Sequence, residues 1–158
     1  LLQLLNRLVR VNQSLHTEAV ADRDTFGVAL RRAREVLRPG SLVIILCDER
    51  ALSDSAEQQL ALLSRHCDLL LLPLSDPLDH ALPAAGLLRF ADRGAQLELD
   101  TLNPDLRQAY RAQGEARQAR WELLAKKLRV LLMPLSTQRE MVEQLREYLT
   151  GEQPVKQT

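Results

Sequence analysis

Carboxylates that follow apolar runs are the residues of this chain best suited to chemistry. The run from Ser41 to Cys47 is apolar, comes after Pro39-Gly40, and leads directly into Asp48. This pattern predicts a strand that is buried on both faces of a parallel sheet. Open α/β sheets bind ligands beyond the carboxyl ends of their strands, so Asp48 is the first candidate site residue. The alternative is that Asp48 caps the turn after the strand.

A second apolar run, 68–74, precedes Asp76-Pro77-Leu78-Asp79. Asp76 and Asp79 could share acid–base work, because unequal burial separates the pKa values of neighbouring carboxyl groups. The interpretation that we favour is an Asp-Pro turn that shapes the loop. Asp48 and Asp76, at adjacent strand ends, leave open an alternative function as a small α/β hydrolase or phosphoryl-transfer enzyme.

The side chains that most often act as nucleophiles or metal ligands lack the motifs that such chemistry needs. The sequence has no Gly-x-Ser-x-Gly elbow and no glycine-rich phosphate loop, and its three histidines do not have the spacing of metal ligands. Cys47 is interpreted as a small buried apolar residue rather than a reactive thiol. We therefore expect a protein that is not an enzyme.

Composition limits the partners of the chain. Its 158 residues, 46% of them hydrophobic, are enough for one domain with its own core. Lys and Arg number 21, as do Asp and Glu, and aromatic residues make up 3%, so nothing favours nucleic acid. The apolar N-terminus is interrupted by polar residues at helical spacing, which predicts an amphipathic helix without membrane contact. Two cysteines at opposite ends of neighbouring strands predict free thiols and a cytoplasmic protein.

Strand and helix patterns alternate along the chain and predict an α/β fold, with a Rossmann-like, mostly parallel sheet, flanking helices and an inserted β-hairpin. Strands are expected at 41–47, 68–74 and 130–135, the hairpin at 87–91 and 95–99, and helices at the N-terminus, 25–37, 53–64, 104–128 and 138–149. Asp24 or Thr25 is expected to cap the second helix. Pro73 donates no ladder hydrogen bond and is expected at a strand end or on an edge strand.

Three core strands are few for this class of fold. We therefore expect residues 1–150 to be part of a larger α/β domain whose N-terminal strands lie upstream, and residues 151–158 to be a disordered tail. A sheet that lacks strands exposes an unpaired edge, which is a template for another chain. The fragment is accordingly expected to form a homodimer or another edge-paired assembly.

Several segments resemble known families. Thr25-Phe26-Gly27-Val28 at the start of a helix, and Asp48 after the next strand, look like the second half of a von Willebrand factor A domain. Asp76-Pro77-Leu78-Asp79 with Leu82-Pro83, together with Leu99-Asp100-Thr101, resembles the bacterial domain of unknown function fifty-eight. That family is von Willebrand factor A-like and is associated with MoxR-type AAA+ ATPases. The resemblance runs from about residue 25 to residue 149, and it implies that residues 1–150 are part of a von Willebrand factor A-like domain without its N-terminal strands.

The resemblance implies a site and a partner. In von Willebrand A domains the corresponding Thr and Asp belong to a metal-ion-dependent adhesion site, so Thr25 and Asp48 are implied ligands of Mg²⁺ or Mn²⁺ in a full-length parent. The main motif of that site, Asp-x-Ser-x-Ser, would precede Leu1, and no cofactor is expected in this fragment. Cys47 and Glu49 depart from the serine and the aromatic residue that are usual in the family. The resemblance also implies a non-enzymatic protein-interaction module whose partner is a MoxR-type AAA+ ATPase.

Overall fold

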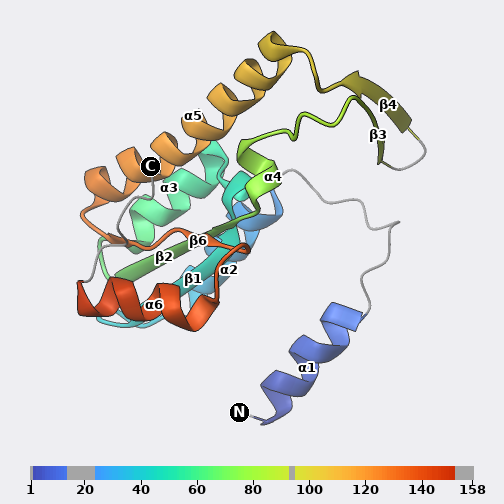
Figure 1. Cartoon of the computed structure of the whole chain (residues 1–158). Coiled ribbons are helices and arrows are strands. Elements are labelled where there is room, and N and C mark those ends of the chain that lie inside the picture. The colour runs from blue at the N-terminus through green and yellow to red at the C-terminus, as the bar shows by residue number, and fades with distance from the viewer. Residues whose placement is uncertain (1, 14–23, 93–94, 152–158) are drawn as a thin grey trace.

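The computed structural model describes residues 2–13, 24–92 and 95–151. It contains a four-stranded sheet, a separate hairpin, and helices on both faces of the sheet (Figure 1). The strands are β1 (Leu42–Asp48), β2 (Asp68–Ser75), β3 (Leu87–Asp92), β4 (Ala95–Asp100), β5 (Leu131–Leu132) and β6 (Leu135–Ser136). The helices are α1 (Leu2–Gln13), α2 (Thr25–Val36), α3 (Asp54–Leu63), α4 (Pro77–His80), α5 (Pro104–Leu128) and α6 (Met141–Thr150). The expected tail, from residue 152 onward, lies outside the described residues.

All pairings in the central sheet are parallel. β1 pairs with β2 in a register that sets Val43 beside Leu69 and Asp48 beside Leu74, and the other side of β2 pairs with β5 and β6. β1 is therefore an edge strand in the part of the chain that the structure describes. The antiparallel hairpin β3–β4 is inserted between α4 and α5. The predicted α/β fold with a mostly parallel sheet and an inserted hairpin is confirmed.

Two prolines divide the strand that was expected at 130–135 into β5 and β6. The pairs on both sides of the break, Leu71 with Leu132 and Leu74 with Leu135, keep one register, which sets Pro73 opposite Pro134. The N–H of Met133 donates to the carbonyl oxygen of Leu71 at 2.8 Å, and the next ladder bond would come from residue 73, where proline has no N–H group to donate. The prediction that Pro73 lies at a strand end or on an edge is wrong. β2 is a central strand that tolerates Pro73 because its neighbour is interrupted at the same level.

Helices α2, α3 and α5 pack against one face of the sheet, and the main core lies beneath them. Leu60 of α3 and Leu71 of β2 are fully buried there, and Trp121 of α5 is almost fully buried. The indole Nε1 of Trp121 donates a hydrogen bond of 2.8 Å to the carbonyl oxygen of Glu49, which directly follows β1. This contact fixes the carboxyl end of β1 against α5.

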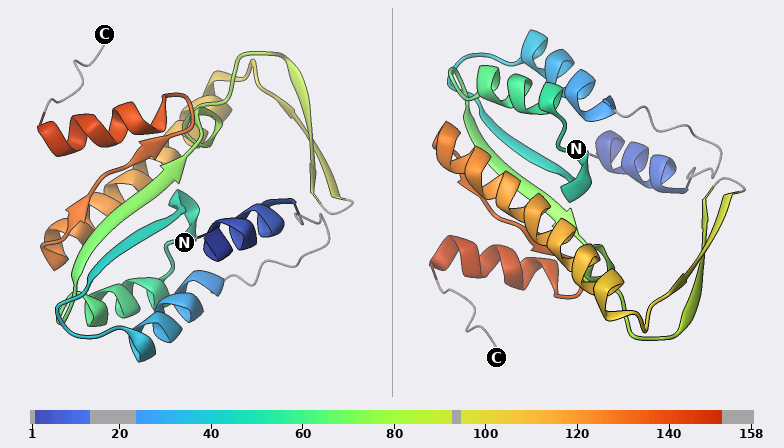
Figure 2. Two further views of the ribbon diagram at one scale, coloured as in Figure 1. Left: turned by 90° about the horizontal axis from the view of Figure 1, so that it is seen from below. Right: turned by 90° about the horizontal axis from the view of Figure 1, so that it is seen from above.

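The opposite face of the sheet is covered unevenly (Figure 2). Helix α6 packs over apolar side chains of β2 and of the segment that contains β5 and β6, namely Leu70, Leu72, Leu74, Met133 and Leu135. On β1 itself, Leu42, Ile44 and Leu46 are between 60% and 65% exposed. The prediction that this strand is buried on both faces is therefore wrong. The reason is that α6 covers the neighbouring strands and leaves this face of β1 bare.

Capping explains where two of the helices begin. The side chain of Asn103 accepts hydrogen bonds from the first turn of α5, which starts at Pro104 as predicted. Glu140 caps α6 in the same way, so that helix starts at Met141 and not at the expected residue 138.

The hairpin β3–β4 projects from the body beyond the N-terminal end of α5 (Figures 1 and 2).

Candidate functional site

The carboxyl ends of β1 and β2 bring the candidate acidic residues to one end of the sheet. Asp48 is the last residue of β1 and pairs with Leu74 of β2, two residues before Asp76. Arg50 connects the two loops, because its guanidinium group lies 3.5 Å from Oδ1 of Asp48 and 3.1 Å from Oδ1 of Asp79. The candidate site therefore consists of two loops that a single arginine bridges.

Asp48 caps the turn that follows β1. Its Oδ1 accepts a hydrogen bond of 2.7 Å from the backbone N–H of Arg50, inside the 3₁₀ turn η1 (Glu49–Ala51). The carboxylate is 57% exposed. This geometry matches the turn-capping interpretation. It is also compatible with cation binding, because a carboxylate has a second oxygen to offer.

Thr25, the other candidate metal ligand, is an exposed residue at the start of α2. The preceding residue, Asp24, occupies the expected N-cap position, but its carboxylate accepts a hydrogen bond of 2.9 Å from the hydroxyl of Ser53. Gly27 makes room for this contact, since a Cβ atom there would lie 2.5 Å from Oδ1 of Asp24. Ser53 itself caps α3. The start of α2 is thus tied to the loop that continues from Asp48.

This end of the sheet offers few side-chain ligands for a metal ion. In the described ranges, no group of three or more His, Cys, Asp or Glu side chains is arranged to hold one. The hydroxyl of Thr25 and the carboxylate of Asp48 are oxygen donors of the type that Mg²⁺ prefers, but Mg²⁺ requires six ligands in near-octahedral geometry. Metal binding by these two residues stays a prediction.

The segment with Asp76 and Asp79 forms the capped helix α4. Oδ1 of Asp76 accepts a hydrogen bond of 2.9 Å from the N–H of Leu78, and the carboxylate of Asp79 accepts one of 2.8 Å from the N–H of Asp76. The hydroxyl of Thr137 donates to Oδ2 of Asp76 at 2.5 Å. This hydroxyl, together with the N–H of Leu78, lowers the pKa of Asp76. Asp76 is therefore charged at neutral pH and lacks the proton that a general acid must supply.

A buried polar network lies beneath these loops, and sequence reasoning missed it. Glu49 is only 6% exposed, and its Oε2 lies 2.8 Å from Nε2 of His80. Its Oε1 lies 4.0 Å from Nε of Arg117. Both of these atoms are buried, and neither has a hydrogen-bond partner. The network joins η1, α4 and α5. Its only signal in the sequence was Glu49, which stands where the family usually has an aromatic residue.

The loop that carries the family motif docks closely on α5. Arg117 donates a hydrogen bond to the carbonyl oxygen of Asp79. Gly114 lies directly under α4, where a Cβ atom would be 2.9 Å from Nδ1 and 3.0 Å from Cα of His80. Glycine at this position therefore permits an approach that any other residue would obstruct.

The rest of the motif loop borders a cavity. Leu82 is half-buried and lines a hollow of about 650 Å³ between the loop and α5, opposite Arg107 and Arg111. Pro83 is exposed, and its carbonyl oxygen accepts a hydrogen bond of 3.0 Å from the N–H of Ala85. The motif loop thus shapes the surface between α4 and the hairpin, and Pro77 is the first residue of α4.

Both cysteines are free thiols, as predicted. Burial raises the pKa of Cys47 to about 12, and the neighbouring charge of Asp48 adds to the effect. A thiol with this pKa stays protonated at neutral pH and is a poor nucleophile. Cys47 therefore behaves as the small apolar residue that its place in the strand suggests.

The fold and the site define an α/β domain whose strand-end acids cap their own loops, with one bare strand at the edge of the sheet. No helix among the described residues is long and apolar enough to cross a membrane. A family model described as "Protein of unknown function DUF58" matches residues 2–120, so the chain belongs to this family. Comparison with curated proteins and with solved structures finds no match. The family predicted from the motifs is confirmed, although its match starts earlier and ends earlier than the expected range.

Proposed function

We propose that this chain is a non-enzymatic protein-interaction module that binds its partner by strand addition at the open edge of β1. The observation that carries the proposal is this edge. β1 is seven residues long, contains no proline, and pairs with β2 alone among the described residues. The strand has no lysine side chain and an unbroken register with β2, and no segment of the described part of the chain pairs with its other edge, so the usual protection of edge strands is missing there.

The backbone groups that face the open edge follow from the ladder. The N–H of Asp68 donates to the carbonyl oxygen of Ser41 at 3.0 Å. Because alternate residues of a parallel strand turn to alternate sides, residues 41, 43, 45 and 47 bond to β2. The N–H and C=O groups of Leu42, Ile44 and Leu46 therefore point toward the edge. These are the groups to which an added strand would bond.

Two partners fit this edge. A second copy of the chain can pair its β1 antiparallel to the first across a two-fold axis, which gives a homodimer. The resemblance to von Willebrand A-like proteins associated with MoxR names a MoxR-type AAA+ ATPase as the physiological partner. The neutral net charge favours a protein partner over nucleic acid, and two free thiols favour the cytoplasm.

The proposal includes a divalent cation in a longer parent protein. Asp48 and Thr25 would contribute to its coordination, as in metal-ion-dependent adhesion sites, with Mg²⁺ or Mn²⁺ as the ion. The support is that the bond between Asp24 and Ser53 ties the start of α2 to the loop after Asp48. The hydrolase alternative has less support, because Asp48 and Asp76 both already accept hydrogen bonds within their own loops.

The test uses two substitutions at one position. Ile44→Pro removes an N–H that faces the edge and leaves the donors to β2 in place, whereas Ile44→Ala keeps the N–H and removes only the side chain. Light scattering would measure self-association, and co-purification would measure binding of a MoxR-type ATPase. We expect Ile44→Pro to weaken association about tenfold, the equivalent of one lost hydrogen bond, and Ile44→Ala to retain it. Equal effects would refute strand addition, and turnover of phosphate esters that Asp48→Ala abolishes would establish the hydrolase.

A further inference from the structure

We propose that helix α1 docks, within the same chain, into an apolar slot formed by the bare face of β1 and the adjoining flank of α6. The slot lies on the face of the sheet, whereas strand addition uses its edge. This inference therefore goes beyond the proposed function, and each can fail without the other.

The floor of the slot is the bare face of β1. Leu42, Ile44 and Leu46 are alternate residues of one strand, so their side chains point to the same side. The register places Ile44 beside Leu70 and Leu46 beside Leu72, which belong to the cluster under α6. The apolar surface thus continues from the covered part of the sheet onto the bare strand without a polar break.

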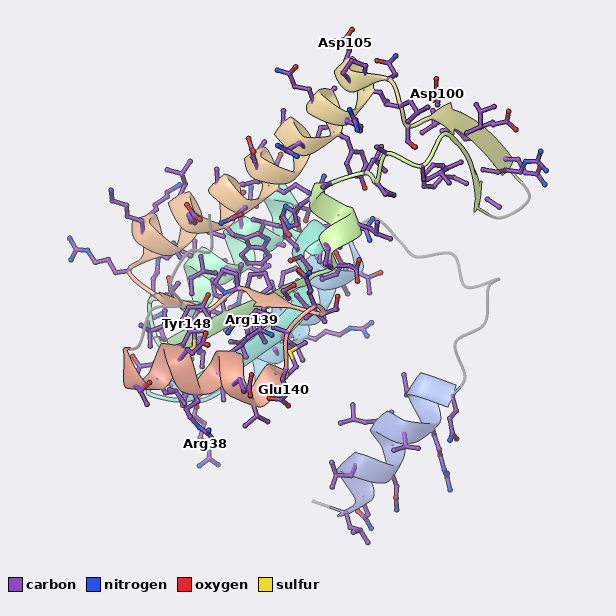
Figure 3. All side chains as sticks on the ribbon, in the orientation of Figure 1. Arg38, Asp100, Asp105, Arg139, Glu140 and Tyr148 are labelled. Atoms are coloured by element: carbon purple, nitrogen blue, oxygen red, sulfur yellow. The ribbon has the colours of Figure 1, made fainter. Side chains whose placement is uncertain are left out.

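The wall of the slot is one flank of α6. The opposite flank lies over β6, because Gln144 donates to the carbonyl oxygen of Ser136 at 2.8 Å and Tyr148 to that of Pro134 at 3.1 Å. Figure 3 shows Tyr148 on the side of α6 that faces the sheet. Since β1 and β6 lie on opposite sides of β2, the other flank of α6 faces β1.

Two apolar residues occupy this flank. At 100° per residue, Val142 and Leu149 lie about 20° apart on the helix and far from Gln144 and Tyr148. Val142 is 58% exposed and Leu149 is 74% exposed. The floor and the wall of the slot therefore both present exposed aliphatic side chains. A contiguous apolar surface of this kind marks a site that another element covers.

Helix α1 has the complementary surface. Its apolar side chains Leu2, Leu5, Leu8, Val9 and Val11 fall within one half of the helix circumference and are all at least half exposed. Its polar side chains Gln3, Asn6, Arg7 and Arg10 fall on the other side. A helix of 12 residues is only marginally stable in water unless its apolar face packs against something. α1 therefore needs a surface such as the slot.

The lengths of α1, of β1 and of the segment that joins α1 to α2 are compatible with docking. Twelve residues of helix are about 18 Å long, and the seven residues of β1 span about 23 Å. Eleven residues separate Gln13 from Thr25, and a segment of that length reaches about 40 Å at most, enough to cross the sheet. In α/β domains, helices cover both faces of the sheet, and one more helix beside α6 completes the second layer.

Crosslinking tests the docking directly. Leu5→Cys is combined with Ile44→Cys in a Cys47→Ala, Cys67→Ser background and treated with a short bismaleimide. The matched control replaces Leu5→Cys by Asn6→Cys, on the polar side of α1. We expect crosslinks within one chain to form at least tenfold faster for the Leu5 pair. Equal rates for the two pairs would overturn the proposal. Crosslinks that form only between chains would also overturn it, because α1 would then occupy the slot of a second copy.

A second measurement covers the case in which the cysteine variants do not fold. Hydrogen exchange of the α1 amides is compared between wild type, Leu5→Asp with Leu8→Asp, and the control Asn6→Asp, which adds the same type of charge on the polar side. We expect the apolar-side variant to lose protection at least tenfold and the control to keep it. The same low protection in all three proteins would show that α1 is undocked in the wild type.

Discussion

Replacing Gly114 by alanine is expected to destabilise this protein, although alanine is the better helix former. In an exposed helix interior the substitution would gain about 1 kcal/mol from helix propensity. Gly114, however, is buried under α4, where the added Cβ would lie 2.9 Å from Nδ1 and 3.0 Å from Cα of His80. The second contact is with backbone, so α4 as a whole must move.

The cost can be estimated from the contacts that such a movement disturbs. Overpacking a tight site costs about 1–3 kcal/mol. The displacement also strains two hydrogen bonds from α5 to α4, one from Arg117 to the carbonyl oxygen of Asp79 and one from Tyr110 to that of Leu78. Partial loss of these bonds adds about 1 kcal/mol. Against the propensity gain of about 1 kcal/mol, the net destabilisation is about 2 kcal/mol.

Urea unfolding followed by circular dichroism measures this difference. With a slope of about 2 kcal/mol/M, the midpoint should fall by about 1 M. Ala109→Gly, at an exposed position of the same helix, calibrates the propensity effect and should destabilise by about 1 kcal/mol. If Gly114→Ala left the protein unchanged or more stable, then α4 would not pack on α5 as closely as described, and the reasoning would be refuted.

Two further predictions follow from the titrating groups. Thr137→Val is expected to raise the pKa of Asp76, since the Thr137 hydroxyl is the main cause of its lowered value, and an NMR titration of the carboxyl carbon measures this. Because folding lowers this pKa, the charged carboxylate adds stability above about pH 4, and that contribution is lost as the pH falls through the lowered value. Acid should therefore destabilise the wild type more than the Thr137→Val variant. An equal loss of stability in both proteins would contradict the role of the Thr137 hydroxyl in lowering the pKa of Asp76. Burial raises the pKa of the Cys47 thiol to about 12. Cys47 should therefore react with iodoacetamide at pH 8 at least a hundredfold more slowly in the folded protein than in urea, and mass spectrometry measures the two rates. Similar rates would show that the thiol is not buried.

Periodicity and caps were sufficient to predict most of the elements. Asn103-Pro104 marked the start of α5, Ser53 that of α3, and Pro39-Gly40 the loop before β1. These signals are local, because a cap or a proline acts within one turn of the chain. The misplaced start of α6 has the same origin, since Glu140 took the capping role at a position that no standard cap motif announced.

Features that depend on distant parts of the chain could not be predicted in this way. An apolar run such as 41–47 indicates burial but does not show how many helices cover each face, so the bare side of β1 was missed. Pro73 is acceptable in a central strand only because Pro134, far along the chain, interrupts the neighbouring strand. The contacts of Glu49 with His80 and Arg117 join three segments that no motif relates.

The two loops at the carboxyl ends of β1 and β2 are held differently, and this difference bears on the proposed function. The loop after β2 is fixed by its own caps, by Thr137 and by α5, so the carboxylates of Asp76 and Asp79 already accept hydrogen bonds from within the protein. Asp48 is exposed, and its longer contact with Arg50, at 3.5 Å, is the weaker of the two that Arg50 makes. A cation at Asp48 would compete with Arg50 for the carboxylate, and Arg50 would keep its contact with Asp79. Because this exchange occurs at the side chain of the last residue of β1, it leaves the backbone edge groups of Leu42, Ile44 and Leu46 in place, so cation binding at Asp48 does not remove the groups that strand addition uses.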